Sequence, residues 1–358
     1  MTAEDKLSLI TRNLVEVLTE AELKEKLGSG QRLRGYIGYE PSGLVHIGHL
    51  IWMNKVRDLV DAGVHFVVLE ATWHAMINDK LGGDIDLIRK AAWLMREVMR
   101  SVGVDVDRVE FVDAERLASD KDYWALVIKV MKMTSLARMR RALTIMGRSV
   151  DEAELDTSKL IYPAMQVSDI IYLDLDLALG GLDQRKAHVL QREVAERMGR
   201  KKVIALHTPI LTGLSGGKRM EGAEKDEEVA AFKMSKSKAS DAIFVNDAPE
   251  EIRAKVRAAY CPPRQVEFNP VMEINKYLLF ARSGFTLHVD RPQKYGGPVD
   301  FYSYEELERA YVEGRLHPAD LKEATAESLV RLLEGPRKLF ERPDVAQLVK
   351  VLESKVTR

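Results

Sequence analysis

The sequence predicts an α/β fold with a mostly parallel sheet, followed by a smaller and mainly helical domain. Three observations carry this prediction. Short apolar runs alternate with amphipathic helical stretches from Gly35 to about Thr208, and strands that alternate with helices at this interval form parallel sheets with helical crossovers. After Pro249 the pattern becomes helical. The length of 358 residues is enough for two domains with a large core.

The elements are predicted in chain order from hydrophobic periodicity and from the glycines and prolines that interrupt it. The first thirty residues predict one or two helices, ended by Gly28-Ser29-Gly30. Strands are predicted at 35–40, 65–72, 108–114, 175–181 and within 201–211, with helices at 47–62, 87–103, 121–148, 160–173 and 182–199. The predicted domains are an N-terminal helical segment (1–30), an α/β domain (31–248) with an insertion at about 115–158 and a charged loop at 215–240, and a helical domain (249–358).

Composition excludes several classes of protein. With 46% hydrophobic and 30% charged residues, the chain has the composition of an ordinary globular protein, and no window approaches the roughly 18 apolar residues of a membrane span. The N-terminus lacks an apolar signal core. The single cysteine, Cys261, excludes a disulfide framework and a cysteine-based zinc knuckle, so we expect a cytoplasmic protein. The net charge of −1 argues against a whole-surface nucleic-acid binder but allows a local basic patch.

The stretch "GYIGYEPSGLVHIGHL" (35–50) carries the first candidate site. His46 and His49 lie three residues apart, whereas a helical zinc pair usually lies four apart with a third ligand elsewhere, so a metal site is disfavoured. Two exposed helix histidines remain an alternative on spacing alone. The pair follows a strand and a "PSG" turn, where a helix N-terminus offers free N–H groups to phosphate. Gly48 lets a flat ring or sugar approach the backbone. This context predicts a nucleotide triphosphate site.

The run "KMSKS" (233–237) supplies the cations that such a site needs. Lys233 and Lys236 can neutralise phosphate charge, and Ser235 and Ser237 can donate hydrogen bonds. By itself a Lys/Ser pentapeptide is usually a solvated loop. Combined with the HIGH-containing helix about 190 residues upstream, it predicts an ATP site.

"HIGH" and "KMSKS" together resemble the signature of class I aminoacyl-tRNA synthetases. The resemblance implies a Rossmann-type catalytic domain in which the two motifs face each other across ATP. It places His46 and His49 at the α-phosphate and ribose, and Lys233 and Lys236 at the leaving pyrophosphate. Mg²⁺ would accompany ATP, held by phosphates and water without a dedicated protein site.

A second candidate site lies in "YPAMQVSD". Tyr162, Gln166 and Asp169 fall at i, i+4 and i+7, on one face of a helix that is otherwise apolar. A polar face toward solvent is the alternative. Gln184 follows the glycine pair at 180–181, at the start of the next helix.

These residues resemble tyrosyl-tRNA synthetases of the archaeal and eukaryotic type, over nearly the whole chain from "YIGYEPSG" through "GGLDQRK" to "LHPADLK". The resemblance implies that L-tyrosine and tRNA(Tyr) are the substrates. It implies that Tyr36 and Asp169 bind the phenol hydroxyl and that Tyr162, Gln166 and Gln184 hold the α-amino end. Tryptophanyl-tRNA synthetase and a non-catalytic RNA-binding relative are the alternatives.

One motif departs from the family's usual pattern. This chain has "ATWHA" at 71–75, where "ADLHA" is usual, so Thr72 and Trp73 replace an aspartate and a leucine while His74 is kept. The consequence of this change is open at the level of sequence.

Candidate tRNA contacts lie in two regions. The helical segment 121–148 carries seven basic residues and one acid. Its Arg138, Arg140 and Arg141 are candidates for the acceptor arm, and a dimer-interface helix is the alternative; the family resemblance implies a homodimer.

In the C-terminal domain the resemblance indicates anticodon contacts. Tyr295 could stack on a base, and His317 or Asp320 could bond to a base edge. Asp320 could equally belong to a helix cap.

Overall fold

The computed structural model describes residues 1–146, 156–217, 232–235 and 239–355. Contacts divide the chain into two compact units. The first contains Met1–Leu44, Trp52–Thr208 and Gln347–Thr357, and the second contains Val45–Ile51 and Pro209–Ala346. Units defined by contacts need not coincide with functional domains, so the domain limits predicted above stay predictions.

A six-stranded sheet forms the centre of the first unit, which confirms the predicted α/β class. Its strands lie in the order β1-β6-β5-β2-β3-β4. Their bounds are β1 Glu16–Leu18, β2 Arg34–Tyr39, β3 His65–Glu70, β4 Val109–Asp113, β5 Leu177–Gly181 and β6 Ile204–Thr208. All neighbouring pairs are parallel except β1 with β6, which is antiparallel.

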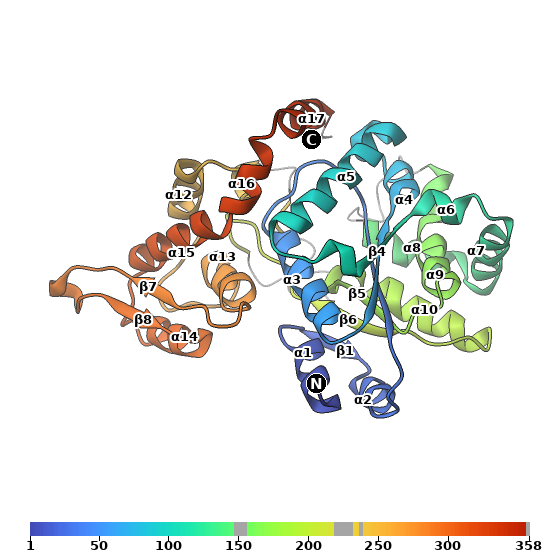
Figure 1. Cartoon of the computed structure of the whole chain (residues 1–358), viewed down its shortest axis with the longest axis horizontal. Coiled ribbons are helices and arrows are strands. Elements are labelled where there is room, and N and C mark those ends of the chain that lie inside the picture. Colours follow the sequence, from blue (N-terminus) through green and yellow to red (C-terminus); the bar gives the residue numbers. More distant parts are fainter. Residues whose placement is uncertain (147–155, 218–231, 236–238, 356–358) are drawn as a thin grey trace. The chain divides into compact units, whose positions relative to one another are not determined.

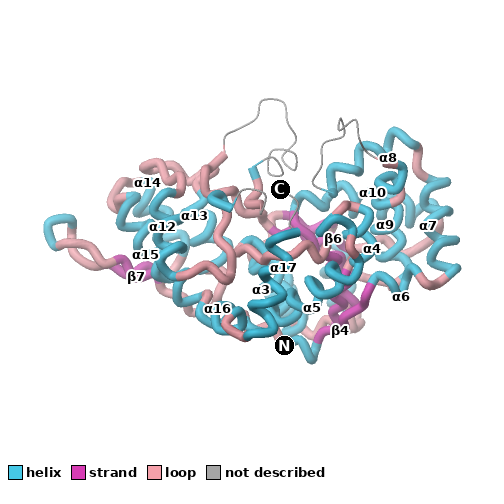
Figure 2. The backbone as a smooth tube through the Cα atoms, turned by 90° about the horizontal axis from the view of Figure 1, so that it is seen from above, coloured by secondary structure: helices cyan, strands magenta, loops and turns pink. Residues whose placement is uncertain are grey.

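Helices cover both faces of this sheet. Figures 1 and 2 show α3 (Gly48–Asp61) and α5 (Ile85–Ser101) on one side of the strands, and α9 (Tyr162–Tyr172) and α10 (Arg185–Arg197) on the other. Because both faces are covered, the inner strands are continuous apolar runs rather than alternating ones. Phe66, Val67 and Val68 on β3 are all fully buried.

The strand order creates a switch point beside β2. From β2 the chain proceeds outward through β3 to β4, and then returns to place β5 and β6 on the other side of β2. Tyr36 on β2 is in register with Ala178 on β5. Ligands of open α/β sheets bind outside the carboxyl ends of two such strands, so Glu40, after β2, and Gln184, after β5, lie at the expected edge.

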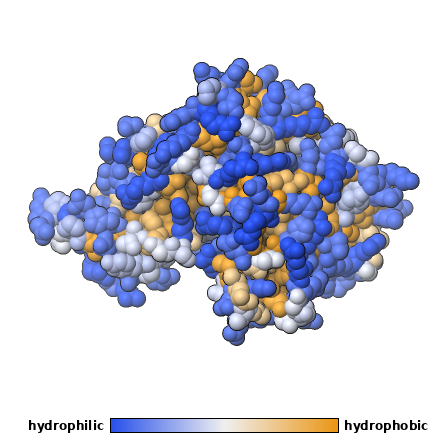
Figure 3. Space-filling view, viewed as in Figure 1, coloured by the Kyte–Doolittle hydropathy of each residue, from blue (hydrophilic) through white to orange (hydrophobic). Residues whose placement is uncertain are grey.

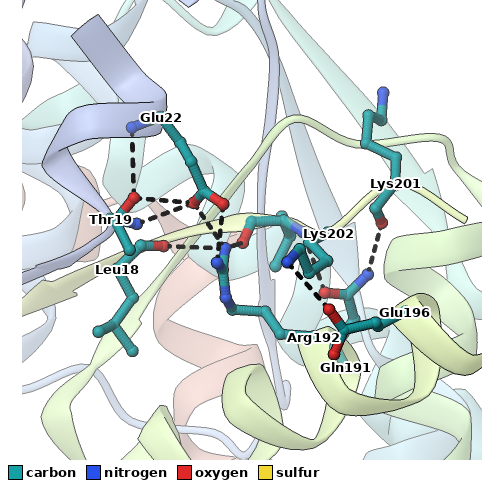
Figure 4. Close-up of polar contacts among 9 residues, drawn as sticks. Leu18, Thr19, Glu22, Gln191, Arg192, Glu196, Lys201 and Lys202 are labelled. Atoms are coloured by element: carbon teal, nitrogen blue, oxygen red, sulfur yellow. Dashed lines mark hydrogen bonds and ion pairs between the residues drawn. The ribbon is translucent and has the colours of Figure 1, made fainter. Parts of the chain in front are cut away.

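The N-terminal region contains two helices, as predicted, and one strand that was not predicted. Helices α1 (Ala3–Thr11) and α2 (Glu20–Gly28) flank β1. Figure 4 shows how Arg192 of α10 holds this region: its guanidinium donates to both Glu22 carboxylate oxygens at 2.9 Å and to the Leu18 carbonyl at 3.3 Å. With three residues, β1 is too short to show an alternating pattern, and its pairing with β6 is a tertiary contact.

The predicted insertion is helical in its described part. It contains α6 (Ala114–Ala118), α7 (Lys121–Met133) and α8 (Leu136–Ala142), then short 3₁₀ turns at Leu143–Met146 and Thr157–Leu160, while residues 147–155 lie outside the described chain. Helix α7 packs on α9 with Tyr123, Val127 and Val130 buried. Ile128 and Leu136 are exposed. A further short helix, α4 (Thr72–Ile77), follows β3 and continues into a 3₁₀ turn at Lys80–Gly83.

The second unit is mainly helical beyond Pro249, as predicted. Its helices are α12 (Pro249–Ala258), α13 (Pro270–Ile274), which continues as a π-helical turn at Asn275–Leu279, α14 (Tyr304–Val312), α15 (Pro318–Leu332) and α16 (Glu334–Phe340). Helix α17 (Pro343–Lys355), whose residues from Gln347 on belong to the first unit, ends the described chain. The antiparallel pair β7 (Leu287–Val289) and β8 (Val299–Phe301) was not predicted, again because each strand has only three residues.

The described helices include none long and apolar enough to cross a bilayer. Hydrophilic residues dominate the face drawn in Figure 3, and apolar residues lie in patches between them.

Candidate functional site

A cluster of buried polar side chains, the candidate amino-acid pocket, lies in the first unit around β2 and α9. Tyr36 comes from β2, and Tyr162, Gln166 and Asp169 come from α9. Tyr36 and Asp169 are each 2% exposed and Tyr162 is 6% exposed. The i, i+4, i+7 face predicted from the sequence is therefore an inward face, and the alternative of a polar face toward solvent is excluded.

Asp169 is the charged group of this pocket. The Tyr123 hydroxyl donates to its Oδ1 at 2.7 Å, and His74 Nε2 lies 3.2 Å from its Oδ2. Burial raises the pKa values of Tyr36 and Tyr123 well above the usual range for a phenol, and the negative charge of Asp169 raises both further. Both hydroxyls therefore stay protonated at neutral pH and can act as donors.

Two glutamines continue the pocket. Gln166 donates to Gln184 Oε1 at 3.1 Å, and Gln184 donates in turn to the Ile145 carbonyl at 3.1 Å. Gln184 ends the 3₁₀ turn that follows β5. A hydrogen bond from Gln166 to the Tyr36 hydroxyl opposes the rise in the pKa of that phenol. The structure thus brings Gln166, Gln184 and Tyr36 together from three elements.

Glu40 completes the described network and was missed in the sequence. Both of its carboxylate oxygens accept from Asn78, at 2.9 and 3.1 Å, and Lys80 Nζ lies 3.4 Å away. Burial raises the pKa of Tyr162 well above its usual range, and the charge of Glu40 and a hydrogen bond to it raise it further. The sequence contains a signal that could have marked Glu40 as a site residue, because it is the first charged residue after a buried strand.

The structure assigns a partner to the unusual Thr72. Its hydroxyl donates to Asp113 Oδ1 at 2.5 Å, and the same oxygen accepts from the Glu115 backbone N–H at 2.9 Å. Thr72 thereby ties the first turn of α4 to the N-cap of α6. The neighbouring Trp73 packs edge-on against Trp124, with ring centroids 6.1 Å apart.

The "HIGH" residues lie in the second unit. Helix α3 begins at Gly48 rather than at the predicted position 47, so His46 precedes the helix and pairs with Phe244 in an antiparallel bridge. The Ile47 backbone N–H donates to the Ile243 carbonyl at 2.9 Å. The rings of His46 and His49 still meet, with centroids 4.1 Å apart.

Gly48 is required by a close approach of the His46 ring. The Gly48 N–H donates to His46 Nδ1 at 3.2 Å, and a Cβ at this position would lie 2.9 Å from two atoms of that ring. The ring against Gly48 in this structure is that of His46, and the approach of a ligand's ring or sugar to Gly48 stays a prediction.

The first half of "KMSKS" is described, and Lys236 and Ser237 lie outside the described residues. Lys233 pairs with Thr212 in an antiparallel bridge, and the Met234 N–H donates to the Leu211 carbonyl at 2.7 Å. Glu273 of α13 accepts from the Thr212 N–H at 2.8 Å and from its hydroxyl at 2.9 Å. Burial raises the pKa of Glu273.

Short backbone pairings within this unit hold the described residues of both motifs. Residues 232–234 pair with 211–213, and residues 243–245 pair with 45–47. Lys233, Ser235, His46 and His49 are all half-buried. Short backbone bridges thus hold His46 and Lys233, whereas His49 lies in the first turn of α3.

The candidate tRNA-binding residues come from α8 of the first unit and from the helical part of the second unit. On α8, Arg138 pairs with Glu193 at 3.2 Å, while Arg140 and Arg141 are exposed. Tyr295, in the connection between β7 and β8, is 61% exposed. The N-cap of α15 is His317, whose Nδ1 accepts from the Ala319 N–H at 3.2 Å, so the cap role considered for Asp320 belongs to His317.

Among the described residues, no group of three or more His, Cys, Asp or Glu side chains could hold a metal ion.

Comparison with known proteins places this chain in a family. The family model for class I tRNA synthetases (W and Y) matches residues 29–334. The tyrosine–tRNA ligase of Aeropyrum pernix is 63% identical over 99% of this chain and 98% of its own length, and that of Sulfurisphaera tokodaii is 58% identical over 100% and 99%. The crystal structure of tyrosyl-tRNA synthetase complexed with L-tyrosine from Pyrococcus horikoshii is 41% identical, covers 99% of this chain and 100% of that chain, and superposes with a TM-score of 0.90. The chain therefore belongs to the class I tRNA synthetases of the tryptophan and tyrosine family and, within it, to the tyrosine–tRNA ligases.

Proposed function

We propose that this protein is an enzyme that attaches L-tyrosine to tRNA(Tyr) in two steps. In the first, tyrosine and ATP form tyrosyl-adenylate and release pyrophosphate. In the second, the tyrosyl group passes to the terminal adenosine of the tRNA. The observation that carries the proposal is the buried Asp169, which lies beside the Tyr123 hydroxyl and the His74 ring, in a chain that is similar along its whole length to tyrosine–tRNA ligases.

The pocket chemistry suits a phenol. The substrate hydroxyl donates to Asp169 and accepts from Tyr36, while Tyr162, Gln166 and Gln184 bind the α-ammonium group. Phenylalanine would leave these buried groups unpaired, which costs more than a missing contact. Tyrosyl-tRNA synthetases are themselves the standard example of this effect, with roughly 10⁵-fold rejection of phenylalanine and no editing.

Adenylate formation needs no general base, because the tyrosine carboxylate is ionised at neutral pH. One carboxylate oxygen attacks the α-phosphorus, and the bond to pyrophosphate breaks. Catalysis then consists of positioning and of stabilising charge on phosphate oxygens. We assign His46, His49 and Gly48 to the α-phosphate and ribose. The "KMSKS" residues Lys233, Ser235, Lys236 and Ser237 are assigned to the β- and γ-phosphates. When bound, Mg²⁺ supplies further charge neutralisation through the phosphates.

The RNA contacts and the assembly are part of the same proposal. Arg138, Arg140 and Arg141 would contact the acceptor arm, and Tyr295, His317 and Asp320 the anticodon. The exposed apolar side chains of α7 and α8, including Ile128 at 57% and Leu136 at 65% exposure, support a homodimer contact on the same helices. A cytoplasmic location stays a prediction.

The two alternatives are less well supported. A tryptophan indole offers one N–H donor and no hydroxyl, so it would leave Tyr36 or Asp169 without a partner. A non-catalytic relative has no need for a buried carboxylate that costs folding free energy.

Tyrosine-dependent exchange between ATP and labelled pyrophosphate tests the proposal, run in parallel with tryptophan and phenylalanine. We expect exchange with tyrosine and charging of tRNA(Tyr) transcripts. Exchange that depends on tryptophan, or no exchange with any amino acid, would overturn it.

A further inference from the structure

We propose that His74 is a positioning residue for amino-acid selection: it fixes the Asp169 carboxylate and thereby sets the preference for tyrosine over phenylalanine. This inference rests on the proposed function, because it concerns the same pocket. No motif in the sequence assigned His74 a role, since it lies 95 positions from Asp169 along the chain.

The surroundings of His74 indicate a functional group rather than a packed core residue. The residue is 2% exposed, and its ring meets the Tyr162 ring edge-on with centroids 5.0 Å apart. Within the part of the chain that the structure describes, neither ring nitrogen has a hydrogen-bond partner. Buried polar atoms are almost always paired, so an unpaired imidazole beside a pocket needs an explanation.

The distance to Asp169 provides that explanation. His74 Nε2 lies 3.2 Å from Oδ2, within hydrogen-bonding distance, although no hydrogen bond joins the two groups in the structure. With the proton on Nε2, a small rotation of the ring aligns the donor with Oδ2. Tyr123 already holds Oδ1 at 2.7 Å, so the two oxygens of Asp169 would be held by separate donors.

The backbone on either side of His74 is held in place. Two residues earlier, the Thr72 hydroxyl ties the start of α4 to Asp113 at 2.5 Å. The His74 carbonyl accepts from the Asn78 N–H at 2.9 Å. Trp73 packs against Trp124, the neighbour of Tyr123. The departure from the usual "ADLHA" pattern therefore anchors the helix that carries His74.

A carboxylate held at both oxygens explains selectivity in physical terms. When phenylalanine binds, a free Asp169 side chain could turn toward another donor or toward water and recover part of the lost hydrogen bond. When both oxygens are held, the side chain cannot turn, and its lone pair toward the missing hydroxyl stays unpaired. The full cost of that unpaired group then discriminates against phenylalanine.

Three substitutions separate positioning from packing. In His74→Gln the side-chain amide nitrogen can occupy the place of Nε2, whereas in His74→Asn it reaches only the place of Nδ1. His74→Met keeps volume and offers no donor. The readout is the ratio of kcat/KM for tyrosine to kcat/KM for phenylalanine in pyrophosphate exchange. We expect the ratio for His74→Gln to stay close to that of the wild type. The ratio for His74→Asn and for His74→Met should fall about tenfold to a hundredfold, as expected for the loss of a hydrogen bond to a charged group.

The controls make the outcomes distinct. The KM for ATP and the melting temperature report on folding, and neither should follow the selectivity ratio. An unchanged selectivity ratio in His74→Asn and His74→Met, or an equal fall of the ratio in all three variants, overturns this inference. Either outcome leaves the proposed function standing. Absence of exchange with tyrosine in the wild type overturns the proposed function, and this inference with it.

A measurement without substitution covers the case in which the variants do not fold. In ¹⁵N-histidine-labelled wild-type protein, we expect NMR to show His74 protonated at Nε2 and its signal to shift when tyrosine is added. Protonation at Nδ1 alone, or no response to tyrosine, would overturn the inference.

Discussion

The proposed amino-acid pocket in the first unit and the motifs proposed to bind phosphate in the second unit are built in opposite ways. In the pocket, side chains from five elements contact one another, and Tyr36 and Asp169 are almost fully buried. The histidines and Lys233 of the motifs are half-buried, and it is their backbones that are held, through short antiparallel ladders at His46 and Lys233.

This difference follows from the ligands that the two sites are proposed to bind. A binding site distinguishes the hydroxyl of tyrosine from the hydrogen atom of phenylalanine only where water is excluded. Only there does an unpaired polar group carry the full free-energy cost of losing its partner. A triphosphate carries charges that attract cations even at a half-exposed site. Selection therefore needs buried side chains, and charge stabilisation needs a correctly placed backbone.

The largest effect is expected from the phosphate motif. Lys233→Ala should lower kcat for pyrophosphate exchange by about 10²–10³-fold, the usual loss for one group that stabilises transition-state charge, with little change in the KM for tyrosine. Lys24→Ala, at an exposed lysine of α2 paired with Glu20, is the control. A variant at position 233 with wild-type exchange would remove this lysine from the proposed site.

The buried pocket should give the next largest effect. Asp169→Asn keeps the shape but removes the charge, so kcat/KM for tyrosine should fall about 10- to 100-fold while that for phenylalanine stays nearly unchanged. The measurement is exchange with each amino acid. If both fall by the same factor, Asp169 serves the fold rather than the phenol.

An exposed aromatic residue should affect only the RNA step. Tyr295→Ala should raise the KM for tRNA in charging by about 5- to 100-fold, since stacking of one base contributes about 1–3 kcal/mol. Pyrophosphate exchange should not change. Tyr302→Ala, at a tyrosine that is 68% exposed next to β8, provides the matched control. Equal losses in both variants would argue against a specific stack at position 295.

The smallest effect concerns pH and the interior of the first unit. His188 Nδ1 lies 2.9 Å from His207 Nε2, and His207 Nδ1 lies 2.7 Å from Glu16. Burial lowers the pKa values of both histidines, and their mutual repulsion adds to this at His188; Glu16 opposes it at His207. The folded-state pKa values of both histidines lie below the unfolded value of roughly 6.5. The contribution of the uncharged pair to the free energy of unfolding is therefore present above that pH and is lost as the pH falls.

Urea unfolding at several pH values measures this loss. The free energy of unfolding should decrease between about pH 7 and pH 5, and the decrease should be shallower in His207→Gln. His288→Asn, at an exposed histidine paired with Asp300, should leave the slope unchanged. A wild-type slope equal to that of His207→Gln would contradict the assignment to this buried pair.

Local patterns predicted most of the fold and supplied the residues that are proposed for both sites. Strand and helix alternation is a property of neighbouring residues, so the α/β class and the five parallel strands followed from it. The strands β1, β7 and β8 were not predicted, because three residues show no period. Each of them forms only by pairing with another strand.

Sequence by itself determined the chemistry available to this protein: the two motifs, the polar face of α9 and the aromatic and amide groups near it. Only tertiary structure decided which groups act together. Tyr123 reaches Asp169 across 46 positions and Thr72 reaches Asp113 across 41, and His46 contacts His49 from outside the helix. The physical reason is that propensity and periodicity act over a few residues, whereas the partner of a buried polar group is set by which elements pack together.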